Sequence, residues 1–177
     1  MNKKLNIGVI SCSVMAQLHM KAVIDHPNAE LYMICDINEA LLNETAAKYN
    51  ISRKTTDYRQ MLADPAVDAV IIVTPDQTHR EISVAALEAG KHVLCEKPMA
   101  LTLDDCKAMI DAAAKAKTKM MVGQICRYTP GFVAAKNLIE RGEIGELFFV
   151  ETEYAHDYAH IDVEWRLDPL RHGFLGG

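Results

Sequence analysis

A carboxylate and an amine stand side by side directly after a short apolar run in the middle of the chain. The run at 93–95 predicts a buried strand, and Glu96, Lys97 and Pro98 follow it. In open parallel sheets, ligands bind outside the carboxyl ends of the strands. Lys97 is therefore the candidate catalytic residue, because its amine would hydrogen-bond a substrate hydroxyl and help its proton leave. Glu96 would orient Lys97. The alternative is a solvated surface ion pair, which contributes little.

A second acid, Asp36, follows another apolar run, Leu31–Cys35. In dinucleotide-binding folds, an acidic residue about 20 residues beyond the first turn accepts hydrogen bonds from the ribose hydroxyls. A carboxylate in this place repels a 2′-phosphate, so Asp36 favours NAD over NADP. The alternative is an aspartate that only caps the turn at the end of its strand.

The first apolar run, Leu5–Ile10, leads into a turn where a dinucleotide fold would carry the pattern G-x-G-x-x-G/A. Serine occupies both of the first two glycine positions, and Ala16 occupies the last. A serine Cβ hinders the approach of a pyrophosphate and disfavours a positive φ, although its hydroxyl can donate to phosphate. A helix that begins after this turn would present backbone N–H groups to an anion. The predicted cofactor contacts here are Ser11, Ser13, Val14 and Met15.

Polar residues also follow the apolar run at 68–73. Thr74 and Pro75 form the turn, and His79 falls in the first turn of the next predicted helix. The start of a helix is electropositive and does not favour a protonated imidazole. His79 is either a cofactor contact or a surface residue of that helix.

Alternating strands and helices would position these residues. Apolar runs predict strands at 5–10, 31–35, 68–73, 93–95 and 119–123. Helical spacing predicts helices at 14–24, 40–49, 57–62, 78–89, 103–117 and 130–141. This alternation implies βαβ crossovers and a parallel sheet, and the solid runs of Val and Ile fit a sheet covered on both faces. The predicted fold class is α/β, with a Rossmann-type doubly wound parallel sheet.

The pattern changes near residues 124–130. Leu147–Tyr154 predicts a longer strand that does not belong to another βαβ unit. We therefore expect a dinucleotide-binding domain at 1–124 and the incomplete beginning of an α/β substrate domain at 125–177. His156 and His160 would share a face only on a helix, and their segment is irregular in pattern, so no metal site is predicted.

Composition argues against several classes of function. The chain has 177 residues, a net charge of −5 and no basic cluster, which argues against nucleic acid or an anionic membrane as partner. No apolar run reaches the length of a signal peptide core or a membrane span. The five cysteines are scattered and lack a C-x-x-C pattern. We expect a soluble, reduced, cytoplasmic protein.

As a whole, the sequence resembles the glucose-fructose oxidoreductase, inositol dehydrogenase and rhizopine-catabolism (Gfo/Idh/MocA) family of NAD(P)-dependent dehydrogenases. The resemblance covers essentially the whole chain, and the Glu-Lys-Pro element is its most specific part. The matching residues are Ile7–Ile10, Asp36, Val73–Pro75 with His79, Ala89–Val93, Glu96–Pro98, Gly123–Gln124 with Arg127–Tyr128, and Gly142–Gly145.

The resemblance implies an NAD-dependent enzyme that acts on a secondary hydroxyl of a sugar, an inositol or a related polyol. It implies that Lys97 is catalytic, that Glu96 lies near the nicotinamide, and that Gln124 contacts the cofactor. It also implies that Asp36, Thr74, Pro75 and His79 line the cofactor cleft. Ser11 and Ser13 depart from the family's usual glycines.

Members of this family are roughly twice as long, so we expect a truncated chain that is inactive alone. The alternative is a non-catalytic Rossmann module that senses a nucleotide or binds a partner, and a third hypothesis is a structural remnant that binds nothing. An unpaired apolar strand at 147–154 would drive self-association, so a homo-oligomer is expected.

Overall fold

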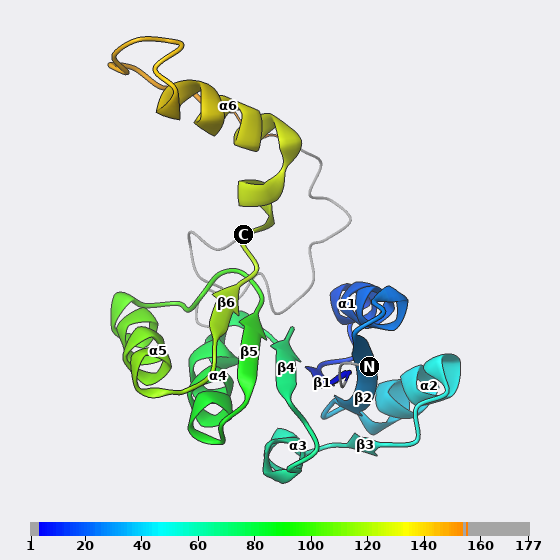
Figure 1. Cartoon of the computed structure of the whole chain (residues 1–177). Helices are drawn as coiled ribbons and strands as arrows, with labels where there is room; N and C mark the ends of the chain where they lie inside the picture. The colour runs from blue at the N-terminus through cyan, green and yellow to red at the C-terminus, as the bar shows by residue number, and fades with distance from the viewer. Residues whose placement is uncertain (1–3, 154, 156–177) are drawn as a thin grey trace.

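Six parallel strands form one sheet in the order β3-β2-β1-β4-β5-β6 (Figure 1). The computed structural model of the chain describes residues 4–153 and 155. From β1 the chain moves outward to β2 and β3, then returns to lay β4 on the other side of β1. This reversal makes a switch point between β1 and β4. The strands are β1 (Leu5–Ile10), β2 (Ala29–Cys35), β3 (Lys54–Thr55), β4 (Ala69–Ile72), β5 (His92–Cys95) and β6 (Met120–Val122).

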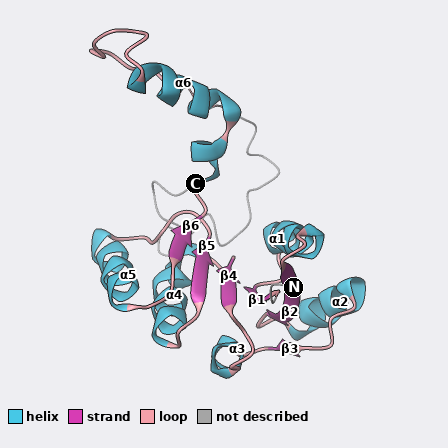
Figure 2. Cartoon of the chain, in the orientation of Figure 1, coloured by secondary structure: helices cyan, strands magenta, loops and turns pink. Residues whose placement is uncertain are grey.

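Helices connect successive strands (Figure 2), and polar side chains cap several of them. Asn38 accepts a hydrogen bond from Leu41 N, and Thr102 accepts one from Asp105 N. Each such cap satisfies one of the free N–H groups of a first helical turn. The α-helices are α1 (Val14–Asp25), α2 (Glu39–Tyr49), α3 (Tyr58–Ala63), α4 (His79–Glu88), α5 (Leu103–Lys115) and α6 (Pro130–Glu140), and the 3-10 helices are η1 (Asp76–Thr78) and η2 (Ile125–Tyr128).

Two apolar cores lie on opposite faces of the sheet. One packs α1 and α2 against the sheet around Val9, Met20 and Ile34. The other packs α3, α4 and α5 around Ile72 and Met109, among others. Side chains of successive strand residues point to opposite faces. The predicted doubly wound α/β fold is therefore confirmed, and so is the inference that both faces of the sheet are covered.

Two strand predictions differ from the structure. The two-residue strand β3 pairs with Ile34 and Cys35 and was not expected, because so short a strand leaves no periodic signal. The strand predicted at Leu147–Tyr154 is wrong over 147–153, which carries no strand. Tyr154 lies outside the described residues. A strand exists only when another strand pairs with it, and no strand of the described residues adjoins this segment.

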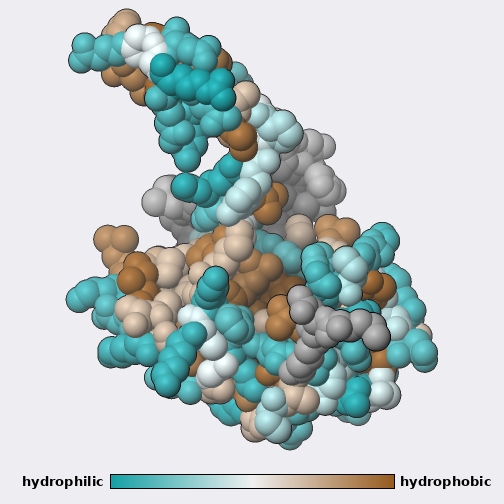
Figure 3. All heavy atoms as spheres, viewed as in Figure 1, coloured by the Kyte–Doolittle hydropathy of each residue, from teal (hydrophilic) through white to brown (hydrophobic). Residues whose placement is uncertain are grey.

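Beyond the sheet, the chain forms an exposed segment at 124–153. Every residue in this range is exposed. Figure 1 shows α6 standing away from the sheet, and it packs against η2. Figure 3 shows apolar side chains among the polar ones along this projecting part. Within residues 4–153 and 155, no helix is long and apolar enough to cross a membrane.

Candidate active site at the carboxyl ends of the strands

The predicted site residues meet at one edge of the sheet. Ser11 follows β1, Asp36 follows β2 and Glu96 follows β5. All the strand pairs are parallel, so their carboxyl ends lie together. Asp36 lies on one side of the switch point between β1 and β4, and Glu96 lies on the other. This is the position at which open α/β sheets bind ligands.

The turn after β1 leads directly into α1, and its two serines hold its shape. Ser11 has a φ of 109°, a conformation that side chains rarely adopt. Its hydroxyl oxygen accepts a hydrogen bond from Ser13 N at 3.1 Å. The Ser13 hydroxyl in turn caps α1 by accepting one from Ala16 N at 3.4 Å. The serines therefore use two N–H groups that a glycine-rich turn would leave for an anion.

The start of α1 still offers donors to an anion. Val14 and Met15 occupy the first two helical positions, whose N–H groups have no acceptor within a helix. Both residues are exposed, at 81% and 49%. A diphosphate would meet these N–H groups and the positive end of the helix dipole. This part of the site fits a dinucleotide.

The Asp36 carboxylate is fixed by the backbone around it. Its Oδ2 accepts a hydrogen bond from Cys12 N at 2.7 Å, and its Oδ1 accepts one from Asn38 N at 2.8 Å. The side chain thus joins the end of β2 to the turn after β1. Each carboxylate oxygen has a further lone pair, so Asp36 can also accept hydrogen bonds from ribose hydroxyls while it keeps its bonds to the backbone.

His79 is fully buried, so the hypothesis that it is a surface residue is wrong. Its Nδ1 lies 2.7 Å from Pro98 O, and its Nε2 lies 2.9 Å from Thr74 O. Carbonyl oxygens only accept, so a ring nitrogen that carries a proton donates to the carbonyl beside it. His79 thereby ties the turn after β4 to the loop that contains Lys97. Its contact with a cofactor stays a prediction, as do those of Thr74 and Pro75, which are half-buried beside it.

Glu96 and Lys97 lie at the end of β5, as expected. Glu96 Oε2 accepts a hydrogen bond from Lys97 N at 3.0 Å, so the acid holds the backbone of the candidate catalytic residue. Burial raises the pKa of Glu96, but hydrogen bonds from His19 and Lys97 N, with the charges of both side chains, bring it below its ordinary value. Lys97 is exposed. Gln124 is exposed just beyond β6, at the same edge of the sheet.

His19 also belongs to this site, although no sequence motif predicted it. His19 Nε2 lies 2.7 Å from Glu96 Oε1. The residue follows Ala16 by three positions and precedes Val23 by four, on the side of α1 that buries both. A histidine within an otherwise apolar stripe of the first helix was the signal that could have revealed it.

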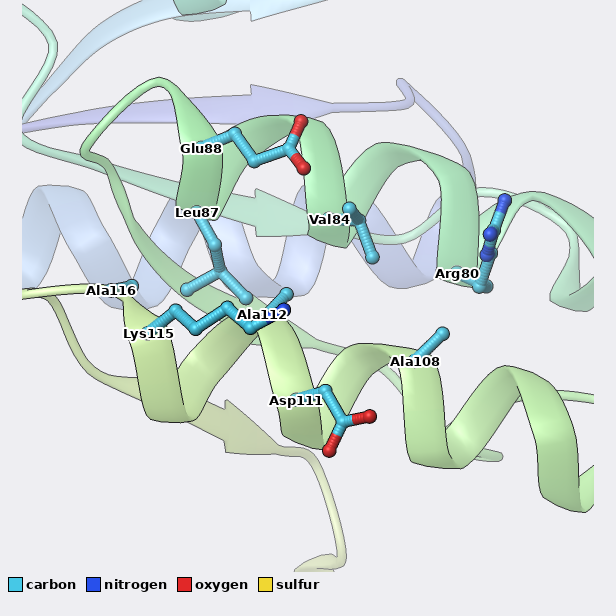
Figure 4. Close-up of a pocket in the computed structure, with 9 residues that line it drawn as sticks. All are labelled: Arg80, Val84, Leu87, Glu88, Ala108, Asp111, Ala112, Lys115 and Ala116. Carbon is cyan, nitrogen blue, oxygen red and sulfur yellow. The ribbon is translucent and has the colours of Figure 1, made fainter.

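A separate groove lies between α4 and α5 (Figure 4), and it contains none of the predicted site residues. Its volume is about 350 Å³. Val84, Leu87 and Ala112 form apolar parts of its wall, and charged side chains stand around them. Among residues 4–153 and 155, no group of three or more His, Cys, Asp or Glu side chains could hold a metal ion. His156 and His160 lie outside the described residues.

Comparison with known proteins relates this site to one family. Residues 5–124 match the family described as "Oxidoreductase family, NAD-binding Rossmann fold" (GFO_IDH_MocA). The chain is 34% identical over 175 residues to levoglucosan dehydrogenase of Pseudarthrobacter phenanthrenivorans, covering 93% of this chain and 45% of that protein. It is 34% identical over 149 residues to inositol 2-dehydrogenase of Salmonella typhimurium, covering 82% of this chain and 44% of that protein.

The fold agrees with solved structures of such proteins. A levoglucosan dehydrogenase in complex with NADH and levoglucosan superposes with a TM-score of 0.76 at 36% identity, covering 81% of this chain and 41% of that chain. The chain thus spans less than half the length of the relatives it matches.

Proposed function

The chain belongs to the Gfo/Idh/MocA oxidoreductase family, which has an NAD-binding Rossmann fold, and from this membership we propose that it is the cofactor-binding half of an NAD-dependent dehydrogenase. The whole enzyme would act on a sugar, an inositol or a related polyol, at a secondary hydroxyl or at the corresponding ketone. One observation carries the proposal: Asp36 and the Glu96–Lys97 pair flank the start of α1 at a single sheet edge. NAD binding is the property of the family, and the polyol is inferred from the relatives.

Each residue of the site has a role in this proposal. The N–H groups of Val14 and Met15 bind the diphosphate, and Asp36 accepts the ribose hydroxyls while disfavouring a 2′-phosphate. Glu96 and Lys97 lie on the nicotinamide side. Lys97 hydrogen-bonds the substrate hydroxyl through its amine and helps the proton of that hydroxyl leave. When bound, NAD supplies the hydride acceptor.

We further propose that residues 1–124 form the cofactor domain and that 125–177 begin a substrate domain. The relatives are more than twice as long as the part of them that this chain covers. The 177-residue chain alone is therefore expected to bind the cofactor without turning over a polyol. The location proposed for the protein is the cytoplasm, in keeping with its cysteine pattern.

The proposal is tested first by calorimetric titration of the 177-residue chain with NADH and with NADPH. We expect saturable binding of NADH and weaker binding of NADPH. Asp36→Ala should bring the two affinities closer together, because it removes the charge that repels the 2′-phosphate. A folded chain that binds neither nucleotide would contradict the proposal.

A non-catalytic Rossmann module is the second candidate, and the serine turn favours it. The hydroxyls of Ser11 and Ser13 accept hydrogen bonds from Ser13 N in the turn and from Ala16 N in the first turn of α1. Lys97→Ala separates the candidates when the chain is joined to the substrate half of a relative. An enzyme should lose turnover by roughly 10²–10⁴-fold while keeping its NADH affinity. Unchanged turnover would remove Lys97 from the mechanism.

We also propose that the chain self-associates through the exposed segment at 124–153. Large apolar side chains that lie together in soluble proteins usually mark an interaction site. Sedimentation velocity at tens of micromolar should show dimers or larger species, whereas a monomer at every concentration would contradict this. The large exposed hydrophobic side chains of this segment are Ile125, Tyr128, Phe132, Val133, Leu138, Ile139, Ile144, Leu147, Phe148, Phe149 and Val150.

A further inference from the structure

A hydrogen bond between His19 and Glu96 joins two elements that are separated in the sheet. His19 belongs to α1, which follows β1, whereas Glu96 follows β5, and β4 lies between these strands. His19 Nε2 lies 2.7 Å from Glu96 Oε1, and the two side chains are only 21% and 14% exposed. The pair therefore connects the helix of the phosphate turn to the loop of the candidate catalytic residue.

The second oxygen of the Glu96 carboxylate is hydrogen-bonded as well. Its Oε2 accepts a hydrogen bond from Lys97 N at 3.0 Å. A Cβ at position 123 would lie 3.4 Å from the carboxyl carbon and from both oxygens, so the carboxylate lies close beside Gly123. Each carboxylate oxygen thus has a hydrogen-bond partner, Lys97 N for Oε2 and His19 Nε2 for Oε1, and α1 supplies the second.

Stability alone is a poor reason for such a pair. Apolar side chains of similar volume are often at least as stabilising as a buried charged pair, because desolvation offsets much of the attraction. The pair lies at the edge where the sheet binds its ligand, beside the backbone of Lys97. Its position therefore indicates a role in the site.

We propose that His19 is a positioning residue that holds the Glu96 carboxylate, and with it the backbone of Lys97, in place for the nicotinamide half of the cofactor. This inference rests on the proposed function, because it concerns the same cleft. It assigns no chemical step to His19, which acts through Glu96.

The first test needs no ligand. The carboxyl carbon of Glu96 is titrated by NMR in the 177-residue chain and in three variants. His19→Leu removes the donor and should raise the pKa of Glu96, because the carboxylate loses the hydrogen bond that favours its charged form. His19→Gln keeps an N–H donor at a similar reach and should restore most of the shift. His26→Leu, a control at the exposed end of α1, should leave the titration unchanged.

The second test compares NADH with ADP-ribose, which carries the same adenosine, diphosphate and second ribose but no nicotinamide. His19→Leu should weaken NADH binding about tenfold while ADP-ribose binding stays within about twofold. His19→Gln should recover the NADH affinity. A residue that merely supports α1 would weaken both ligands equally when replaced, so that result overturns the inference.

Failure of the proposed function and failure of the inference about His19 give different results. If the unaltered chain binds neither nucleotide, the proposed function fails, and the role of His19 toward nicotinamide fails with it. The titration still decides whether His19 holds Glu96: an unchanged Glu96 pKa in His19→Leu overturns that linkage, whatever the ligands do.

Discussion

Removing the Asp36 carboxylate should destabilise the fold as well as change cofactor selection. In Asp36→Ala, the N–H groups of Cys12 and Asn38 lose their acceptor. Asn38 is exposed, so water replaces the carboxylate there. Cys12 is fully buried, and its N–H would remain unpaired.

The expected loss of stability follows from the buried N–H group of Cys12. A hydrogen bond to a charged group contributes about 1.5–3 kcal/mol. The family match covers residues 5–124, and a unit of about 120 residues has an unfolding entropy of about 0.25 kcal/mol/K at its midpoint. Asp36→Ala should therefore lower Tm by about 6–12 °C. Asp36→Asn keeps one neutral acceptor and should lose roughly half as much.

Thermal unfolding followed by circular dichroism measures this loss. Asp25→Ala is the matched control, since Asp25 is exposed in an i,i+4 pair with Lys21 and its loss should leave Tm unchanged. The reasoning is refuted if Asp36→Ala unfolds at the same temperature as Asp25→Ala. In that case the carboxylate does not hold the turn, and a change in NADH affinity would report the ribose contact alone.

Three further predictions test other parts of the structure. Gly8→Ala would press a Cβ against Sδ of the buried Met61 and should lower the free energy of unfolding, measured with urea, by about 1–3 kcal/mol. The double variant with Met61→Ala should lose less stability than the sum of the two single changes. The fold lowers the pKa of Glu96, so the carboxylate stabilises the folded chain at pH values above its unfolded pKa of about 4.3. This stabilisation is lost as the pH falls through the pKa that Glu96 has in the folded chain. Between neutral and acidic pH, the free energy of unfolding should therefore fall less in Glu96→Gln than in the original chain. Parallel plots of this free energy against pH would contradict the lowered pKa of Glu96. At pH 8, a thiol reagent should modify the exposed Cys126 in the native chain, but Cys12, Cys35 and Cys95 only after unfolding. Burial raises the pKa of Cys12 to about 11 and the pKa values of Cys35 and Cys95 to about 12.

Much of the fold could be predicted because its signals are local. Solid apolar runs predicted β1, β4 and β5, and helical spacing between the runs predicted the crossovers. Parallel strands have their carboxyl ends together, so the positions of Asp36 and Glu96 at one edge followed from the topology. The strand predicted at 147–154 failed because strand formation depends on a partner, which an apolar run does not supply.

The details of the site required the three-dimensional structure. His19 and Glu96 are 77 residues apart, and no sequence periodicity indicates that they touch. The burial of His79 depends on carbonyl groups from two different loops. The serine turn was expected to disfavour a positive φ, yet Ser11 adopts one while its hydroxyl binds Ser13 N. Hydrogen bonds between distant or neighbouring backbones decide such cases, and residue types alone do not reveal them.

The exposed helix α6 has a consequence for the order in which parts of the chain open. α6 has 11 residues, and isolated helices shorter than about 12–15 residues are marginal in water. Its amide hydrogens should therefore exchange with solvent far faster than those of β1 and β4, whose opening requires unfolding of both cores. Protection of α6 would rise only when another surface covers it, so hydrogen exchange along this helix reports directly when the chain has found a partner.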